Sequence, residues 1–127
     1  MMLMVASNEG WKAFGTMSPD EIQRHVQFMQ DVNRELERSG ELVDARGLDL
    51  PDNAKIVHAD DKGAPIVTDG PFAEAKEFLA GYWIVDVETP ERAYAIAAHI
   101  STAPGRGGTP MRFPVQLRRV MSHAEEL

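Results

Sequence analysis

Three side chains of this 127-residue sequence are candidates for proton-transfer chemistry. His25 lies three residues after Ile22 and four before Met29 in a predicted helix, so it falls on or beside the apolar side of that helix. A histidine there needs a polar partner. Either a backbone or side-chain acceptor holds it structurally, or it lies in a cleft and exchanges protons near neutral pH. In the second case Asp69 or Asp44 would orient its ring and complete a general acid/base pair.

Both aspartates also have structural explanations. Asp69 begins the sequence Asp-Gly-Pro-Phe, in which its carboxylate can accept backbone N–H bonds at a turn. The glycine there permits a positive φ, the proline fixes the chain, and Phe72 is expected to anchor in the core. The functional alternative is a carboxylate at the mouth of a pocket, and the two roles are compatible. For Asp44, which follows the apolar residues of a predicted strand, a turn cap is the alternative to catalysis.

Four residues are candidates for ligand binding. Tyr82 and Trp83 are neighbours in a predicted strand and therefore point to opposite faces, one toward a helix and the other toward a cavity between subunits. The ring that faces the cavity either packs or lines a pocket, and Phe72 of the Asp-Gly-Pro-Phe sequence is a further pocket candidate. Arg106 lies in a Gly/Pro-rich loop, where an arginine is either solvated or clamps an anionic substrate.

Composition narrows the classes of function. The chain has no cysteine, and its four histidines lack the close spacing of a local metal site, so neither a metal nor another cofactor is expected. The net charge is −7 and no basic cluster is present, which argues against nucleic-acid binding. No stretch approaches the roughly 20 apolar residues that span a bilayer, and no basic leader precedes the first strand. A cytoplasmic protein with no membrane partner is therefore expected.

Sequence patterns predict the elements that position these residues. Met2–Ala6 is typical of a short buried strand. Ser18 as N-cap, Pro19 at the first helical position and Glu21 as the partner in a capping box predict the start of a long helix. Gly40 can adopt the left-handed conformation that ends it. The predicted apolar face of this helix consists of Ile22, Val26, Met29, Val32 and Leu36.

The rest of the chain alternates between strands and one further helix. We expect a strand within Glu41–Leu50, a hairpin formed by Ala54–Ala59 and Pro65–Thr68 with Gly63 in its turn, one or two helical turns within Ala73–Phe78, a strand opened by Gly81, a helix capped by Thr89, and a last strand near Pro114–Val120. Without the hairpin this order is βαββαβ, an α+β fold of the ferredoxin-like type with an antiparallel sheet. We expect one domain over residues 1–121 and a polar tail over 122–127.

Such a sheet carries both helices on one face, and its other face would present apolar residues to solvent. Pairing two sheets face to face is the simplest way to cover them, so the sequence predicts a homodimer.

Two adjoining segments carry a resemblance to a known family. Thr68–Glu77 (TDGPFAEAKE), followed by Gly81–Asp86 (GYWIVD), resembles the signature of the YCII-related, or DGPF-domain, family. Ser18–Glu21 and Ser39–Asp44 resemble its first helix and second strand, and the resemblance extends from about Met1 to Val120. It implies a dimeric α+β barrel of ferredoxin-like protomers. It also implies a function that is mostly unassigned, frequent proximity to genes for extracytoplasmic-function sigma factors, and, in some relatives, a histidine–aspartate pair acting on small cyclic or aromatic molecules.

Three hypotheses follow for the function. The first is a cofactor-independent enzyme that uses His25 and an aspartate for proton transfer on a small cyclic or aromatic metabolite. The second is a non-catalytic small-ligand-binding or regulatory module associated with an extracytoplasmic-function sigma factor. The third is a purely structural dimer.

Overall fold

The computed structural model of the chain describes residues 2–7, 15–72 and 77–121. Its elements are β1 (Met2–Ser7), α2 (Pro19–Ser39), β2 (Leu42–Gly47), the 3-10 turn η1 (Pro51–Asn53), β3 (Lys55–Ala59), β4 (Pro65–Asp69), β5 (Glu77–Val85), α3 (Pro90–Ser101), the 3-10 turn η2 (Arg106–Gly108) and β6 (Val115–Leu117). The fold is α+β, as predicted from the sequence.

Four strands form the main sheet in the order β2-β5-β1-β6, and each neighbouring pair is antiparallel. This order is compatible with a ferredoxin-like arrangement, and the hairpin β3–β4 forms a separate two-stranded sheet. No helix in the described part of the chain is long and apolar enough to cross a membrane.

Both helices begin at the predicted capping residues. The Ser18 hydroxyl accepts a hydrogen bond from the backbone N–H of Glu21, and the Glu21 carboxylate accepts one from the N–H of Ser18, which completes the capping box of α2. Gly40 ends this helix at a φ of 78°. The Thr89 hydroxyl caps α3 by accepting the N–H of Arg92. These local signals were sufficient because each depends on residues within one helical turn.

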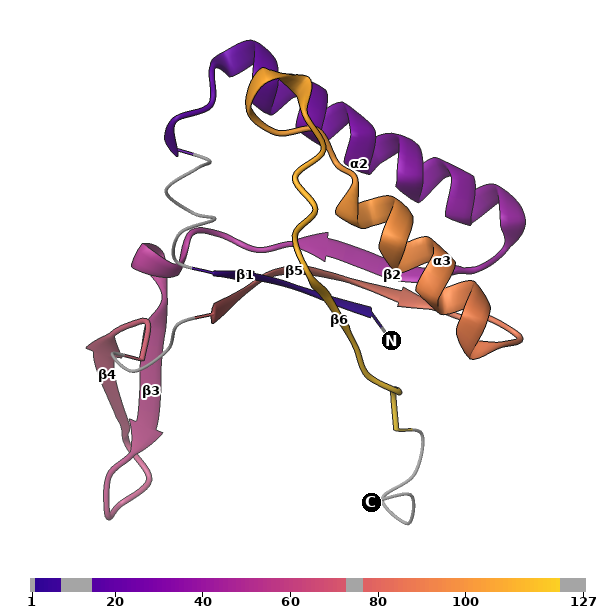
Figure 1. Cartoon of the computed structure of the whole chain (residues 1–127). Coiled ribbons are helices and arrows are strands. Elements are labelled where there is room, and N and C mark those ends of the chain that lie inside the picture. Colours follow the sequence, from indigo (N-terminus) through magenta and orange to yellow (C-terminus); the bar gives the residue numbers. More distant parts are fainter. Residues whose placement is uncertain (1, 8–14, 73–76, 122–127) are drawn as a thin grey trace.

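The two helices cover the same face of the main sheet (Figure 1). The buried cluster between the helices and the sheet combines residues of α2, β5 and α3: Val32, Leu36, Trp83, Val85, Ile96, Ala97 and Ile100. Ile100 is fully buried, and Trp83 is 5% exposed while its indole N–H donates to the Asn33 side-chain oxygen at 2.7 Å. Apolar burial and a satisfied indole donor therefore hold the helices to the sheet.

The first half of α2 packs differently from the prediction. Ile22 and Val26, assigned from the sequence to the apolar face, are 38% and 47% exposed. Here the helix contacts the loop after α3, through a hydrogen bond of His25 to Pro104 and one of Glu21 to Gly107. Only the second half of the predicted stripe faces the sheet, because the first half of α2 lies farther from the strands, beside the loop after α3 (Figure 1).

Gly81 does not open its strand, which begins four residues earlier at Glu77. It lies within β5, opposite Gly47 of β2 and Met4 of β1. A Cβ atom at Gly81 would be 2.8 Å from the backbone oxygen of Arg46. Glycine is therefore required here by close strand packing. Of the predicted helical turns, residues 73–76 lie outside the described residues and Phe78 belongs to β5, while the predicted last strand is shorter, at Val115–Leu117.

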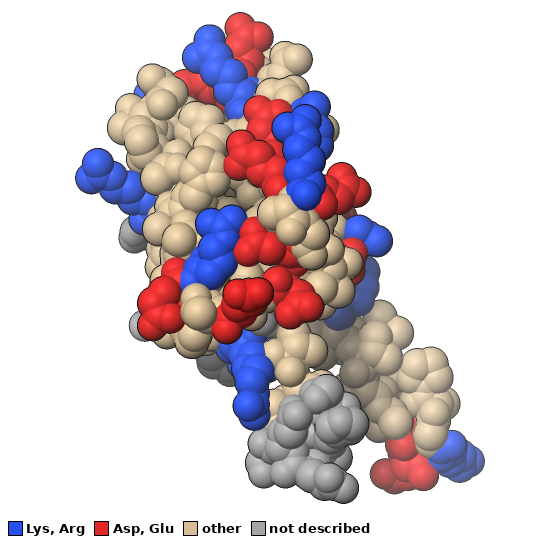
Figure 2. All heavy atoms as spheres, turned by 90° about the vertical axis from the view of Figure 1, so that its right-hand side faces the viewer, with Lys and Arg blue, Asp and Glu red and all other residues tan. Residues whose placement is uncertain are grey.

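The hairpin β3–β4 projects from the side of the sheet opposite the helices (Figure 1). Its turn contains Gly63 at a φ of 83°, as predicted. Val57 and Val67 face each other across the two strands and are 59% and 58% exposed. In Figure 2 the hairpin is mostly uncharged along its length, with charged groups at its tip. A two-stranded sheet is marginally stable alone, so contacts at its base are important.

Candidate functional site

His25 occupies a nearly closed environment between α2 and the loop after α3. Its side chain is 7% exposed, and Nδ1 donates a hydrogen bond to the backbone oxygen of Pro104 at 3.0 Å. Burial lowers the pKa of the imidazole, while the Pro104 carbonyl opposes that shift. A buried ring held by a backbone acceptor is the structural alternative that the sequence allowed. In the described residues no hydrogen bond joins His25 to Asp69 or Asp44, and its catalytic role stays a prediction.

Asp69 lies at the end of β4, where its carboxylate pairs with the Lys55 ammonium at 2.5 Å. The next residues differ from expectation. Gly70 does not have a positive φ; a Cβ there would lie 3.1–3.3 Å from Ala54, whose oxygen accepts the Gly70 N–H. The Gly70–Pro71 peptide bond is cis. Phe72 is 65% exposed and does not anchor in the core, because the hairpin carries it away from the helices.

Asp44 belongs to a polar network on the face of the sheet opposite the helices, which we call the open face. Its carboxylate accepts a hydrogen bond from the Tyr82 hydroxyl at 3.1 Å and pairs with the Arg46 guanidinium at 2.9 Å. The hydrogen bond to Asp44 raises the pKa of Tyr82. Arg46 lies directly across the strands from Tyr82. Sequence analysis proposed Asp44 and Tyr82 as separate candidates, and strand pairing brings them together. Nothing in the sequence indicated a functional role for Arg46.

Trp83 and Arg106, the other ligand-binding candidates, lie away from this network. Trp83 faces the helices and is part of the buried cluster. Its neighbour Tyr82 is therefore the aromatic residue that faces the open side. Arg106 begins η2 and is exposed. The Gly107 N–H beside it donates to the Glu21 carboxylate. The hydrogen bond from the Ser18 N–H, and after it the one from Gly107, lowers the pKa of Glu21. The loop is thus fixed to the start of α2.

A cavity of about 390 Å³ lies at the base of the hairpin. Its wall comes from three stretches of the chain: residues 48–56, which run from the end of β2 through η1 into β3, residues 71–72 after β4, and residues 78–79 of β5. The lining residues are Leu48, Asp49, Leu50, Pro51, Asn53, Ala54, Lys55, Ile56, Pro71, Phe72, Phe78 and Leu79. The cavity thus joins Phe72 to residues for which sequence analysis gave no functional prediction.

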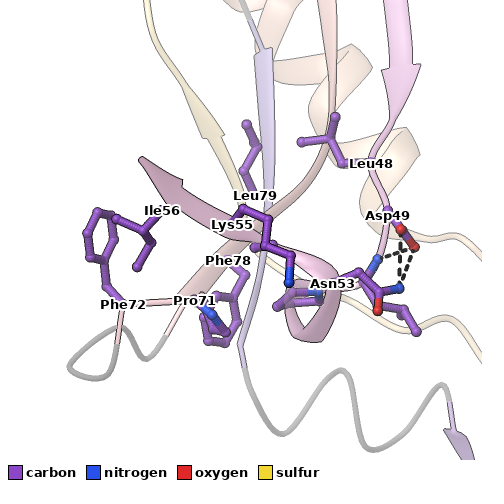
Figure 3. A pocket seen from close by; sticks show the side chains of 12 residues that line it. Leu48, Asp49, Asn53, Lys55, Ile56, Pro71, Phe72, Phe78 and Leu79 are labelled. Atoms are coloured by element: carbon purple, nitrogen blue, oxygen red, sulfur yellow. Dashed lines mark hydrogen bonds between the residues drawn. The ribbon is translucent and has the colours of Figure 1, made fainter. Parts of the chain in front are cut away.

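The arrangement of this wall is visible in Figure 3. Ile56 and Phe72 lie together at one end, the hydrogen-bonded pair Asp49 and Asn53 lies at the opposite end, and Lys55 lies between them. The Asp49 carboxylate accepts the Leu50 N–H at 2.7 Å and the Asn53 side-chain amide at 3.2 Å. These bonds fix its position. The site is a mainly apolar pocket with few polar groups, which is the usual composition of a small-molecule site.

No cluster of three or more potential metal ligands was found among the described side chains. On the face shown in Figure 2, acidic and basic groups lie side by side without a continuous positive patch. The surface in this view lacks the concentrated positive charge by which proteins hold phosphate backbones.

The YCII-related domain model matches residues 1–108 of the chain, which include the network, His25 and the whole cavity wall. The chain belongs to the YCII-related family. An uncharacterized protein from Rhizobium meliloti (strain 1021) is 32% identical over 96 residues, which are 75% of this chain and 77% of that protein. The resemblance seen in the sequence is therefore confirmed. Membership in the YCII-related family places both candidate sites within its characteristic domain.

Proposed function

We propose that this YCII-related protein binds a small molecule in the cavity at the base of the hairpin. The observation that carries the proposal is the cavity itself: about 390 Å³, within the roughly 300–1,000 Å³ of ligand pockets, and lined mainly by apolar side chains. Phe72 supports it further. A 65% exposed phenylalanine on the cavity wall offers apolar surface that a ligand would remove from water.

Titration with a neutral aromatic probe, 3-ethylindole, tests this proposal. Chemical-shift changes of the protein should saturate and should centre on the cavity wall. Phe72→Ala should weaken binding by about three- to tenfold, since it removes part of the apolar contact. Tyr94→Ala is the matched control, because Tyr94 is similarly exposed, at 59%, but lies on α3 away from the cavity. Equal effects of the two substitutions, or no saturable binding, would contradict the proposal.

The protein is also proposed to act as a homodimer in which two open faces meet and form a dimeric α+β barrel. The support is the one-sided packing of the sheet: both helices cover one face, while Tyr82 and Ile84 of β5 alternate with the buried Trp83 and Val85 and therefore face the other side. Ile84→Glu places a charge on the open face, across the strands from Asp44, and should shift the sedimentation coefficient to that of a monomer. Ala95→Glu on the exposed side of α3 adds the same charge and should leave the dimer intact.

A second candidate function, proton transfer on a small cyclic or aromatic molecule, is favoured by the hydrogen bond between Asp44 and Tyr82. In it Asp44 serves as the base, because it is the predicted catalytic carboxylate that lies beside another titratable group on the open face. The measurement is deuterium incorporation from D2O into a panel of cyclic ketones. Asp44→Asn should abolish it, and a rate unaffected by this substitution would refute the role. The parts predicted for His25, Asp69 and an associated sigma factor stay predictions.

A further inference from the structure

Two charged side chains on the cavity wall determine which ligands the cavity can accept. They are Asp49, after β2, and Lys55, at the start of β3. Lys55 already has a partner, since its ammonium lies 2.5 Å from the carboxylate of Asp69 across the hairpin. Its positive charge is therefore largely compensated before any ligand enters.

Asp49, in contrast to Lys55, has no partner of opposite charge among the described residues. Its hydrogen bonds come from uncharged donors, the Leu50 backbone and the Asn53 amide, and no ion pair within residues 15–72 and 77–121 includes it. Neutral donors orient the carboxylate but leave its net charge in place. The uncompensated charge on the described cavity wall is therefore negative.

The remaining wall is apolar and lies away from that charge. Figure 3 shows Ile56 and Phe72 at the end opposite Asp49, with Phe78 and Leu79 between the two ends. A complementary ligand needs an apolar, preferably aromatic, body and a positive group at one end. Phe72 can also stack on an aromatic body.

We propose that the cavity selects aromatic amines, with the ammonium group directed to Asp49 and the ring placed against Ile56 and Phe72. The inference rests on the proposed function, since it assumes that the cavity is a ligand site. It adds the charge of the ligand and the residue that recognises it.

Three probes with one ring system but different charges test the selection: tryptamine, 3-ethylindole and indole-3-acetate. Binding is measured by protein-detected NMR titration. Tryptamine should bind about two- to fivefold more tightly than 3-ethylindole, as expected for a partly exposed ion pair. Indole-3-acetate should bind more weakly than the neutral probe. The preference for tryptamine should shrink as salt is added.

Asp49→Asn should remove the preference for tryptamine while 3-ethylindole still binds, which also shows that the cavity remains folded. The control is Asp52→Asn in η1, which changes the net charge of the protein equally but does not line the cavity. It should keep the preference. Asp69→Asn provides an independent variant: it frees the Lys55 ammonium and should shift the preference toward indole-3-acetate.

The outcomes separate the two proposals. If none of the probes binds, the proposed function fails. If 3-ethylindole binds in the cavity but tryptamine has no advantage, or Asp52→Asn removes the advantage as fully as Asp49→Asn does, selection by Asp49 is overturned while the ligand site stands.

Discussion

The two faces of strand β5 show how one segment serves two purposes. Trp83 points into the helices, is 5% exposed, and donates to Asn33 within a continuous apolar cluster. Tyr82, the residue before it, points to the open face and donates to a carboxylate that is also paired with Arg46. The helix-covered side holds the fold together, whereas the open side and the hairpin carry polar networks, exposed apolar groups and a cavity. Binding is therefore expected where packing is least complete.

The largest effect is expected at Ile100, which lies on α3 and is fully buried. Ile100→Ala should lower the free energy of unfolding by about 2–5 kcal/mol, because it removes buried methylene groups and leaves a cavity. Val57→Ala on the hairpin should change it by less than about 0.5 kcal/mol, since Val57 is 59% exposed. Urea unfolding followed by circular dichroism measures both. Similar losses would mean that the hairpin is as well packed as the helix side.

Trp83 and Tyr82 allow the two faces to be compared within one strand. Trp83→Phe leaves the Asn33 oxygen without its indole donor and should cost about 1–3 kcal/mol of unfolding free energy. Tyr82→Phe should cost less, because its partner Asp44 keeps Arg46 and access to water. Both variants are compared in the same urea series. A larger loss for Tyr82→Phe would reverse the assignment of the two faces.

A pH series tests the burial of His25. Because burial lowers its pKa, the unfolded chain binds a proton more readily than the folded chain below the ordinary value of about 6.5. The contribution of neutral His25 to the free energy of unfolding should therefore be fully present above that pH and should fall as the pH decreases through and below it. His25→Gln should flatten the decrease between pH 7.5 and 5. The control His58→Gln, on the exposed hairpin, is expected to keep the wild-type slope.

The smallest effect is expected at the ion pair of Glu41 and Arg92, which joins the start of β2 to α3. Hydrogen bonds from Arg92, and then from Ser39, lower the pKa of Glu41 to about 2. The stabilisation is present above the ordinary pKa of 4.5 and is lost as the pH falls toward 2. Arg92→Met should slightly reduce stability at neutral pH and make the acid-induced loss shallower. An unchanged acid profile would show that the pair contributes nothing.

The elements that the sequence predicted well depend on local signals. The cap of α2 at Ser18, its end at Gly40 and the turn at Gly63 were all confirmed, since each is decided by a few adjacent residues. Errors arose where distant segments decide the outcome. Gly81 is a glycine because β2 approaches it closely inside the sheet, and Ile22 is exposed because the first half of α2 contacts the loop after α3.

The same division applies to the candidate sites. Asp44, Tyr82 and Phe72 were chosen by residue type, but the sequence offered Asp44, or Asp69, as the partner of His25 and gave no partner for Tyr82. Strand register creates the observed pair, and register could not be read from isolated segments. The cavity was not predicted, because its wall combines three stretches that are separated along the chain, residues 48–56, 71–72 and 78–79.

The carboxylate of Glu21 has a consequence for the loop that carries Arg106. One of its oxygens accepts the N–H of Ser18 and the other accepts the N–H of Gly107, so the start of a helix and a distant loop share one side chain. Four residues later, His25 holds the same loop at Pro104. Fraying of the first turn of α2 and release of the loop should therefore occur as a single opening event, with hydrogen exchange rising at both places together.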